Sequence, residues 1–144
     1  MPSTGGETQF LNVDLELVTT VDPSPLLAHW RDTLVLLRDS TDAGRRTIWA
    51  ELPGTPRDVN SAIDELARHV EDLPGRLRAL WDACDDRCFN VGVQAGRAPQ
   101  ATAFPISAHT IAALTAIAAR IEFTVYGIDD AASRRRPRGA AGPS

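Results

Sequence analysis

Apolar and polar residues alternate along residues 10–19 (FLNVDLELVT). The leucines and valines at odd-numbered positions share one side of an extended chain, while Asp14 and Glu16 lie on the other side. A period of two is typical of a half-buried strand. The same alternation predicts further strands at 46–52, 88–94 and 123–126.

Between these strands, apolar residues recur at the spacing of amphipathic helices. Residues 59–70 carry such a stripe, and a second, shorter helix follows the break at Pro74-Gly75. A short helix is expected from Ser24-Pro25, which suits an N-cap followed by the first helical position. Ser107 is expected to cap a final helix. The inward residues of this final helix are predicted to be Ile111, Leu114, Ile117 and Ile121.

Two short apolar segments are less regular. Residues 33–38 (TLVLLR) fit either a continuation of the preceding helix or a buried strand, because a short apolar run is compatible with both. We favour the strand, joined to 46–52 as a hairpin through the polar, glycine-containing link 40–44. Residues 101–106 are expected to form one more short strand.

The resulting order of elements is β-α-β-β-α-β followed by β-α-β. The first six elements match a ferredoxin-like core, and the last three would extend its sheet. The sequence therefore predicts an α+β domain with a mostly antiparallel sheet and with helices packed on one face. If residues 33–38 were helical, the ferredoxin-like topology would fail but the α+β class would remain.

Composition divides the chain into three parts. Residues 1–9 are expected to be a disordered lead, 10–128 a single domain, and 129–144 a flexible, arginine-rich tail. All 15 basic residues are arginines, and four of them lie in the last eleven residues, which contain no acid. The rest of the chain has 19 acidic residues against 11 arginines. A surface of that sign repels phosphate backbones, so nucleic acid is not an expected partner.

The apolar segments of this chain are short. None approaches the roughly 20 residues that a membrane span requires, and residues 1–9 lack the pattern of a secretory signal. We therefore expect a cytoplasmic location and no membrane partner. The absence of lysine together with abundant alanine indicates a GC-rich bacterial genome.

Motifs with specific chemistry are absent from the sequence. It contains no glycine-rich phosphate loop, no Gly-x-Ser-x-Gly elbow and no His-Glu-x-x-His zinc helix. Cys84 and Cys88 have a spacing that zinc sites allow, but the three histidines are scattered along the chain. Cys84 falls in line with the apolar positions of the second helix, as a core cysteine would. The sequence predicts no catalytic residue, no metal site and no cofactor.

One polar surface is a candidate site. It would form if the polar sides of four predicted strands lie next to one another on one face of the sheet. Its members are Asp14, Glu16, Trp49, Glu51, Asn90 and Tyr126. Carboxylates beside aromatic rings could hold a cationic ligand or an arginine of a partner, and paired carboxylates could divide acid and base roles. The simpler interpretation is the solvated face of an antiparallel sheet.

Several features of the chain from Glu51 onward are distinctive as patterns. They are the strand FNVG at 89–92, and the segment FPIS at 104–107 that leads through an apolar helix to IEFTVY at 121–126. In these features the chain resembles uncharacterised bacterial domains of unknown function. The start of the chain, at 12–17, departs from that pattern. The resemblance supports the α+β fold and implies no catalytic residues, because such families have no assigned activity.

Taken together, these patterns favour a non-catalytic protein-interaction module of the immunity or regulatory type. Its acidic body would mask a basic surface of a partner protein. Two alternatives stay open. The first is a small-ligand binder or enzyme that uses Asp14, Glu16, Glu51 and Tyr126, which requires these side chains to converge in a pocket. The second is a structural homo-oligomer joined through the exposed edge of the sheet.

Overall fold

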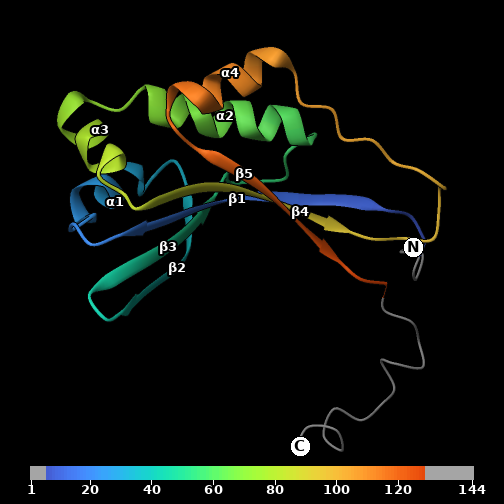
Figure 1. Ribbon diagram of the computed structural model, residues 1–144, viewed down its shortest axis with the longest axis horizontal. Coiled ribbons are helices and arrows are strands. Elements are labelled where there is room, and N and C mark those ends of the chain that lie inside the picture. Colours follow the sequence, from blue (N-terminus) through green and yellow to red (C-terminus); the bar gives the residue numbers. More distant parts are fainter. Residues whose placement is uncertain (1–5, 129–144) are drawn as a thin grey trace, which may run out of the picture.

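Five strands form one open sheet in the order β2-β3-β1-β4-β5 (Figure 1). The computed structural model describes residues 6–128. The strands are β1 (Gln9–Thr19), β2 (Val35–Asp42), β3 (Arg45–Glu51), β4 (Asp86–Gln94) and β5 (Arg120–Tyr126). The helices are α1 (Ser24–Trp30), α2 (Val59–Glu71), α3 (Gly75–Asp82) and α4 (Ala108–Ala116). They lie on one side of the sheet, which confirms the predicted α+β class.

The first four strands have the connectivity of the predicted ferredoxin-like core. β1 lies between β3 and β4 and is antiparallel to both, and β2 pairs antiparallel with β3. α4 then leads from β4 to β5, which pairs parallel with β4. The predicted strand at 101–106 is wrong, because β5 occupies the place beside β4. Phe104 and Ile106 of that segment pack against the core instead.

Strand β2 confirms the predicted strand at 33–38 but not its burial. A two-residue turn joins β2 to β3, and both of its residues, Ala43 and Gly44, have positive φ angles of 53° and 78°. This is the conformation that tight hairpins with a matching strand twist require. Every residue of β2 is exposed. The strand is exposed because it is the outermost one on its side of the sheet.

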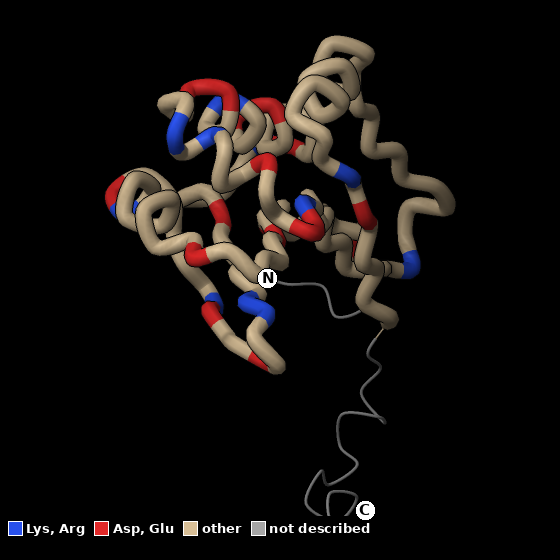
Figure 2. Tube along the Cα trace, turned by 60° about the vertical axis from the view of Figure 1, so that its left-hand side comes forward, with Lys and Arg blue, Asp and Glu red and all other residues tan. Residues whose placement is uncertain are grey.

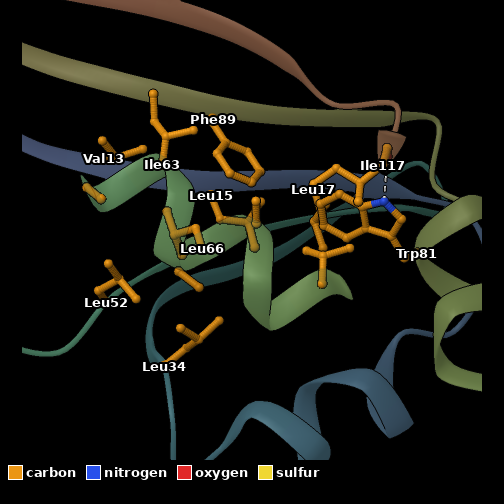
Figure 3. Packing of buried hydrophobic residues seen from close by; sticks show 14 of the residues in the cluster. Val13, Leu15, Leu17, Leu34, Leu52, Ile63, Leu66, Trp81, Phe89 and Ile117 are labelled. Carbon is orange, nitrogen blue, oxygen red and sulfur yellow. Dashed lines mark hydrogen bonds between the residues drawn. The ribbon is translucent and has the colours of Figure 1, made fainter. Parts of the chain in front are cut away.

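The core lies between the sheet and the helices (Figure 3). Val13, Leu15 and Leu17 of β1 are each 1% exposed, as the alternation along β1 predicts. Trp81 of α3 is fully buried, and its indole Nε1–H donates a hydrogen bond to the carbonyl oxygen of Ile117 over 2.8 Å. This bond satisfies a polar group that would otherwise be costly to bury.

The prediction for the last helix is partly wrong. Ser107 does cap α4, since its hydroxyl accepts the backbone N–H of Thr110 at 3.1 Å, and Leu114 is buried. Ile111, however, is 52% exposed, and Ile121 belongs to β5. Ile111 lies within α4 but on its solvent-exposed side, and the chain enters β5 at Arg120, three residues before the predicted start of the last strand at Phe123.

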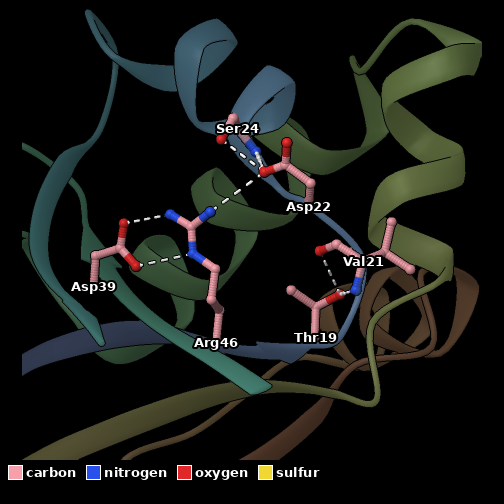
Figure 4. Close-up of polar contacts among 6 residues, drawn as sticks. All are labelled: Thr19, Val21, Asp22, Ser24, Asp39 and Arg46. Atoms are coloured by element: carbon pink, nitrogen blue, oxygen red, sulfur yellow. Dashed lines mark hydrogen bonds and ion pairs between the residues drawn. The ribbon is translucent and has the colours of Figure 1, made fainter. Parts of the chain in front are cut away.

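An ion cluster outside the core ties the edge strand β2 to the turn before α1 (Figure 4). The guanidinium of Arg46 bonds both carboxylate oxygens of Asp39, at 3.2 and 2.6 Å, and reaches Asp22 at 3.3 Å. Asp22 also accepts the backbone N–H of Ser24 at 3.0 Å. α1 therefore begins at Ser24 with Pro23 as its N-cap, so the predicted N-cap at Ser24 is wrong by one residue.

The start of the described chain contacts the connection that follows β4. Glu7 pairs with Ala98, and the backbone N–H of Thr8 donates to the carbonyl of Ala98 over 2.9 Å. Gly96 is needed at this crossing, because a Cβ there would lie only 2.2 Å from the carbonyl carbon of Glu7. Residues 1–5 of the predicted lead and the whole predicted tail, 129–144, lie outside the described residues.

Candidate functional site

The candidate site lies on the face of the sheet opposite the helices. The strand register places Asp14 of β1 directly across from Glu51 of β3 and from Asn90 of β4. Glu16 lies across from Trp49 of β3. Because side chains alternate along a strand, all of these residues project to the side that the leucines and valines leave free. The predicted convergence of polar strand residues is therefore present in the structure.

These strands surround a shallow hollow with a volume of about 290 Å³. The predicted residues Asp14, Glu16, Trp49, Asn90 and Tyr126 all line it. Glu51, the sixth predicted residue, lies beside the hollow, across from Asp14. Three lining residues were not predicted from the sequence, and they are Gly92, Glu122 and Thr124.

Amide side chains orient two of the carboxylates. Asn90 donates from Nδ2 to Oε2 of Glu16 over 2.9 Å, and its own Oδ1 accepts the hydroxyl of Thr124 at 2.8 Å. The side-chain amide of Asn12 donates a hydrogen bond from Nδ2 to Oε1 of Glu51. Hydrogen bonds from neutral amides position these carboxylates but leave their negative charge uncompensated.

Asp14 lies between Glu51 and Glu16, and its ionisation is disfavoured. Partial burial of the carboxyl, followed by the negative charges of Glu51 and then Glu16, raises the pKa of Asp14 from 3.8 to about 6. Burial and like charges act in the same direction here, because both penalise the charged form. The acidic hollow is therefore a place where an added positive charge would relieve repulsion.

Arg120, one of the arginines on this face, is already engaged with other carboxylates. Arg120 of β5 binds both carboxylate oxygens of Asp86 at 2.8 Å and also reaches Glu122 at 2.8 Å. The hydrogen bonds from Arg120 hold the pKa of Asp86 below its usual value. Within residues 6–128, neither arginine nor histidine forms an ion pair with Asp14, Glu16 or Glu51.

Two aromatic rings flank the carboxylates. Trp49 packs against the guanidinium of Arg38, whose Cζ lies 5.3 Å from the ring centroid. Tyr126 lies over the backbone of Gly92, with its Cε2 atom 3.8 Å from the point where a Cβ of residue 92 would stand. Tyr126 is 52% exposed, so its ring lies partly open to solvent beside the hollow. Such rings attract cations through their electron-rich faces.

Charge is distributed unevenly over the molecule. Residues 98–119 contain no Asp, Glu or Arg, and α4 with the connection before it forms the uncoloured region in Figure 2. Acidic residues lie instead on all five strands and on α2. The candidate site therefore lies in the charged part of the molecule, while α4 offers no charge to a partner.

The two cysteines do not contribute a reactive group. Cys84 is buried in the core, where burial raises the pKa of its thiol. Cys88 lies across from Glu16 on the acidic face but is fully buried, and desolvation raises the pKa of its thiol to about 12. Both are free thiols, and a neutral thiol is a poor nucleophile and metal ligand. Among residues 6–128, no group of three or more His, Cys, Asp and Glu side chains is arranged to hold a metal ion.

Two of the three unpredicted residues of the hollow, Glu122 and Thr124, share one cause. The last strand was predicted to begin at Phe123, whereas β5 begins at Arg120. The alternation in RIEFTVY was the available signal, because it places Glu122 and Thr124 on the same side as Tyr126. Gly92 carries no side chain to mark its side of a strand, so no pattern of polarity could assign it to the hollow.

Comparison with known proteins gives no relative for this chain. Family models, curated proteins and solved structures were all compared with it, and none matches. The resemblance of the second half to uncharacterised bacterial domains therefore stays a prediction. In the described part of the chain, no helix has the length and apolar character needed to cross a membrane.

Proposed function

We propose that this chain is a cytoplasmic bacterial protein-interaction module without catalytic activity, of the immunity or regulatory type. Its open sheet face would bind a basic segment of a partner protein. One observation carries the proposal. Asp14, Glu16 and Glu51 adjoin one another on a face without a helix, and no arginine of residues 6–128 pairs with them.

Arginine is the side chain of a partner that fits this face best. Its planar guanidinium can bond a carboxylate through two parallel N–H groups and can stack on an aromatic ring. Glu16 and Tyr126 line the same hollow, so a single guanidinium can use both kinds of contact there. Binding would favour the ionised form of Asp14, and affinity would therefore rise as the pH increases through about 6.

The size of the hollow also favours a side chain over a larger ligand. Its volume of about 290 Å³ is at the bottom of the range of roughly 300–1,000 Å³ that small-molecule sites occupy. An opposite charge on the partner would speed association and exclude acidic competitors.

A second candidate is a binder or enzyme for a small cationic molecule. The raised pKa of Asp14 favours it, because a carboxyl with a pKa of about 6 can exchange a proton near neutral pH. Agmatine, a small guanidinium compound, separates the two candidates. If agmatine binds as tightly as an arginine peptide, the second candidate is preferred.

The proposal is tested by an NMR titration with a hexa-arginine peptide, followed through the backbone amide signals of the protein. We expect the peptide to shift signals of the residues around the hollow, with Asp14, Glu16 and Asn90 among them. Glu16→Gln should weaken binding about three- to fivefold, the size expected for one partly exposed ion pair. The matched control is Glu71→Gln, which removes the same charge from the exposed end of α2.

Two results would reject the interaction proposal. In the first, Glu71→Gln weakens binding as much as Glu16→Gln, which would show that only the overall charge matters. In the second, the peptide shifts signals of the helices and leaves the strand signals unchanged.

Salt provides a further test of the charge contribution. About 0.5 M salt should abolish binding of the hexa-arginine peptide to the acidic hollow, because it shortens the range of electrostatic interactions to a few ångströms.

A further inference from the structure

The two outermost strands of the sheet differ in how open they are to a further strand. β2 has a register shift between Leu36 and Arg38, and it carries Asp39 and Asp42. Bulges and charges of this kind discourage pairing with another chain. β5 pairs with β4 in an uninterrupted register along all seven residues and contains neither proline nor glycine. Its outer edge therefore lacks the register shift that interrupts β2, and its two charged residues, Arg120 and Glu122, pair with each other at 2.8 Å.

The side of β5 that faces the helical layer is apolar and uncovered. Phe123 is 45% exposed and Val125 is 61% exposed. In the strand register they lie beside Val91 and Val93 of β4, which are buried at 0% and 3%. The helical layer thus covers β4 and leaves the apolar residues of β5 open to solvent.

The backbone of β5 also has a defined outward side. The carbonyl of Tyr126 accepts the N–H of Ala95 at 2.9 Å, so the peptide groups of Tyr126 point toward the β4 side of the strand. Peptide groups of successive residues point to opposite edges of a strand. Ile121, Phe123 and Val125 therefore present their N–H and C=O groups outward, where no strand of residues 6–128 pairs with them.

We propose that two copies of this chain pair antiparallel through β5 and so form one continuous sheet across a twofold axis at Phe123. With the axis at this position, Phe123 faces its own copy, and Ile121 faces Val125 of the second copy. All of these residues have outward peptide groups, so each pair can exchange both of its N–H···O bonds. The same surface serves both copies, as a twofold interface requires.

The side chains are self-complementary in this register. On the helix side, Ile121, Phe123 and Val125 of both copies would form one apolar cluster and cover one another. On the acidic side, Arg120 would lie across from Tyr126, and Glu122 across from Thr124. A cation then faces an aromatic ring, and no two like charges lie directly opposite, which is the favourable arrangement for cross-strand pairs.

A single pair of strands buries less area than the standard interface of about 1,600 Å², so we expect a dissociation constant of roughly 10–100 μM. Sedimentation equilibrium at protein concentrations from about 5 μM to about 1 mM extends below and above the expected dissociation constant. The expected result is a monomer at the lowest concentration and a dimer at the highest. The amide signals of residues 120–126 should shift between the two.

Three variants identify the edge that is used. Val125→Glu places a carboxylate in the apolar cluster and should prevent dimer formation. Phe123→Pro removes an outward N–H group that takes no part in the β4 ladder, and it should have the same effect while the monomer stays folded by circular dichroism. Leu37→Glu makes an equivalent change at the exposed edge of β2, where Leu37 is 46% exposed, and should dimerise as the unmodified protein does.

The proposal fails if the unmodified protein stays monomeric at about 1 mM, well above the expected dissociation constant. It also fails if Leu37→Glu abolishes the dimer while Val125→Glu retains it, because the contact would then lie at β2. This inference does not rest on the proposed function, although Tyr126 of the hollow would also lie at the dimer contact. A monomer that binds hexa-arginine, or a dimer that does not bind it, would separate the two.

Discussion

The two faces of the sheet are made by the same strands and yet differ in almost every physical respect. On one face, Leu15 and Phe89 lie beneath the helices and are at most 1% exposed. On the other face, their immediate neighbours Glu16 and Asn90 line an open hollow. Within one strand, one residue therefore stabilises the core while its neighbour contributes to the surface. A surface can change in this architecture without disturbing the core next to it.

The two faces also differ in how well their interactions are satisfied. On the covered face the buried indole N–H of Trp81 finds a partner in the carbonyl of Ile117, and only the indole N–H of Trp30 is a buried side-chain polar group without one among residues 6–128. On the open face, Asp14 is half-buried between two other carboxylates and lacks a cation among residues 6–128. Folding therefore costs free energy at Asp14 when it is ionised, and a basic partner would offset this cost.

The largest difference between the faces should appear when neighbouring residues of β4 are truncated. Phe89→Ala should lower the free energy of unfolding by about 4 kcal/mol, because it removes a fully buried ring and leaves a cavity. Asn90→Ala should lower it by only about 1 kcal/mol, through loss of the hydrogen bonds to Glu16 and Thr124. Urea unfolding measures both values, provided that the dependence of the free energy of unfolding on urea concentration is the same in the variants and the unmodified protein.

If Phe89→Ala does not fold, Phe89→Leu takes its place with an expected loss of roughly 1.5 kcal/mol. Equal losses at Phe89 and Asn90 would show that the faces do not differ as described.

A smaller effect with a distinctive pH dependence is expected at Asp14. The folded-state pKa of about 6 lies above the unfolded value of 3.8, so the native protein binds the proton more tightly between these values. Stability contributed by this proton falls as the pH rises from about 4 to about 6. Asp14→Asn should therefore match the unmodified protein near pH 4 and exceed it by about 1 kcal/mol at pH 7, after discounting for solvent screening.

The measurement is urea unfolding of both proteins from pH 4 to pH 7.5. Asp85→Asn is a control, since it removes an acidic residue that is exposed and lies in the turn before β4. If Asp14→Asn raised the free energy of unfolding by the same amount at every pH, the raised pKa of Asp14 would not be the cause.

The smallest effect is expected where charges on the covered side are already paired. Arg46→Ala removes the contacts to Asp39 and Asp22 but should cost less than about 1 kcal/mol, because these groups are partly exposed. The loss should shrink in about 1 M NaCl, where the screening length is about 3 Å. Arg45→Ala, at the exposed neighbour of Arg46, should have no measurable effect. A salt-independent loss at Arg46 would indicate packing by its side chain instead.

Much of this comparison could be predicted from the sequence, because alternation within a strand decides which side chains share a face. β1 shows this well, since Leu15 and Glu16 fall on their predicted sides. The order of elements also predicted which strands would be neighbours, and that order brought Asp14 next to Glu51. Five of the six predicted site residues line one hollow for this reason.

The errors concern positions that only the assembled molecule decides. The burial of a strand depends on where it lies in the sheet, so the apolar residues of β2 were expected inside although β2 is an edge. The segment 101–106 has the composition of a strand, but β5 takes the place beside β4. Helix periodicity likewise continues through Ile121, although the chain has already entered β5. The first two outcomes have no local signal, whereas the alternation in RIEFTVY is a local signal for the third.

The most direct test of the acidic hollow is the titration of the Asp14 carboxyl group, followed by carbon-13 NMR. We predict a pKa of about 6 for Asp14, and a lower pKa in Glu51→Gln and in Glu16→Gln, because each variant removes a neighbouring negative charge. A pKa near 4 in the unmodified protein, unchanged in both variants, would show that these carboxylates do not converge. The proposed binding surface would then have no physical basis.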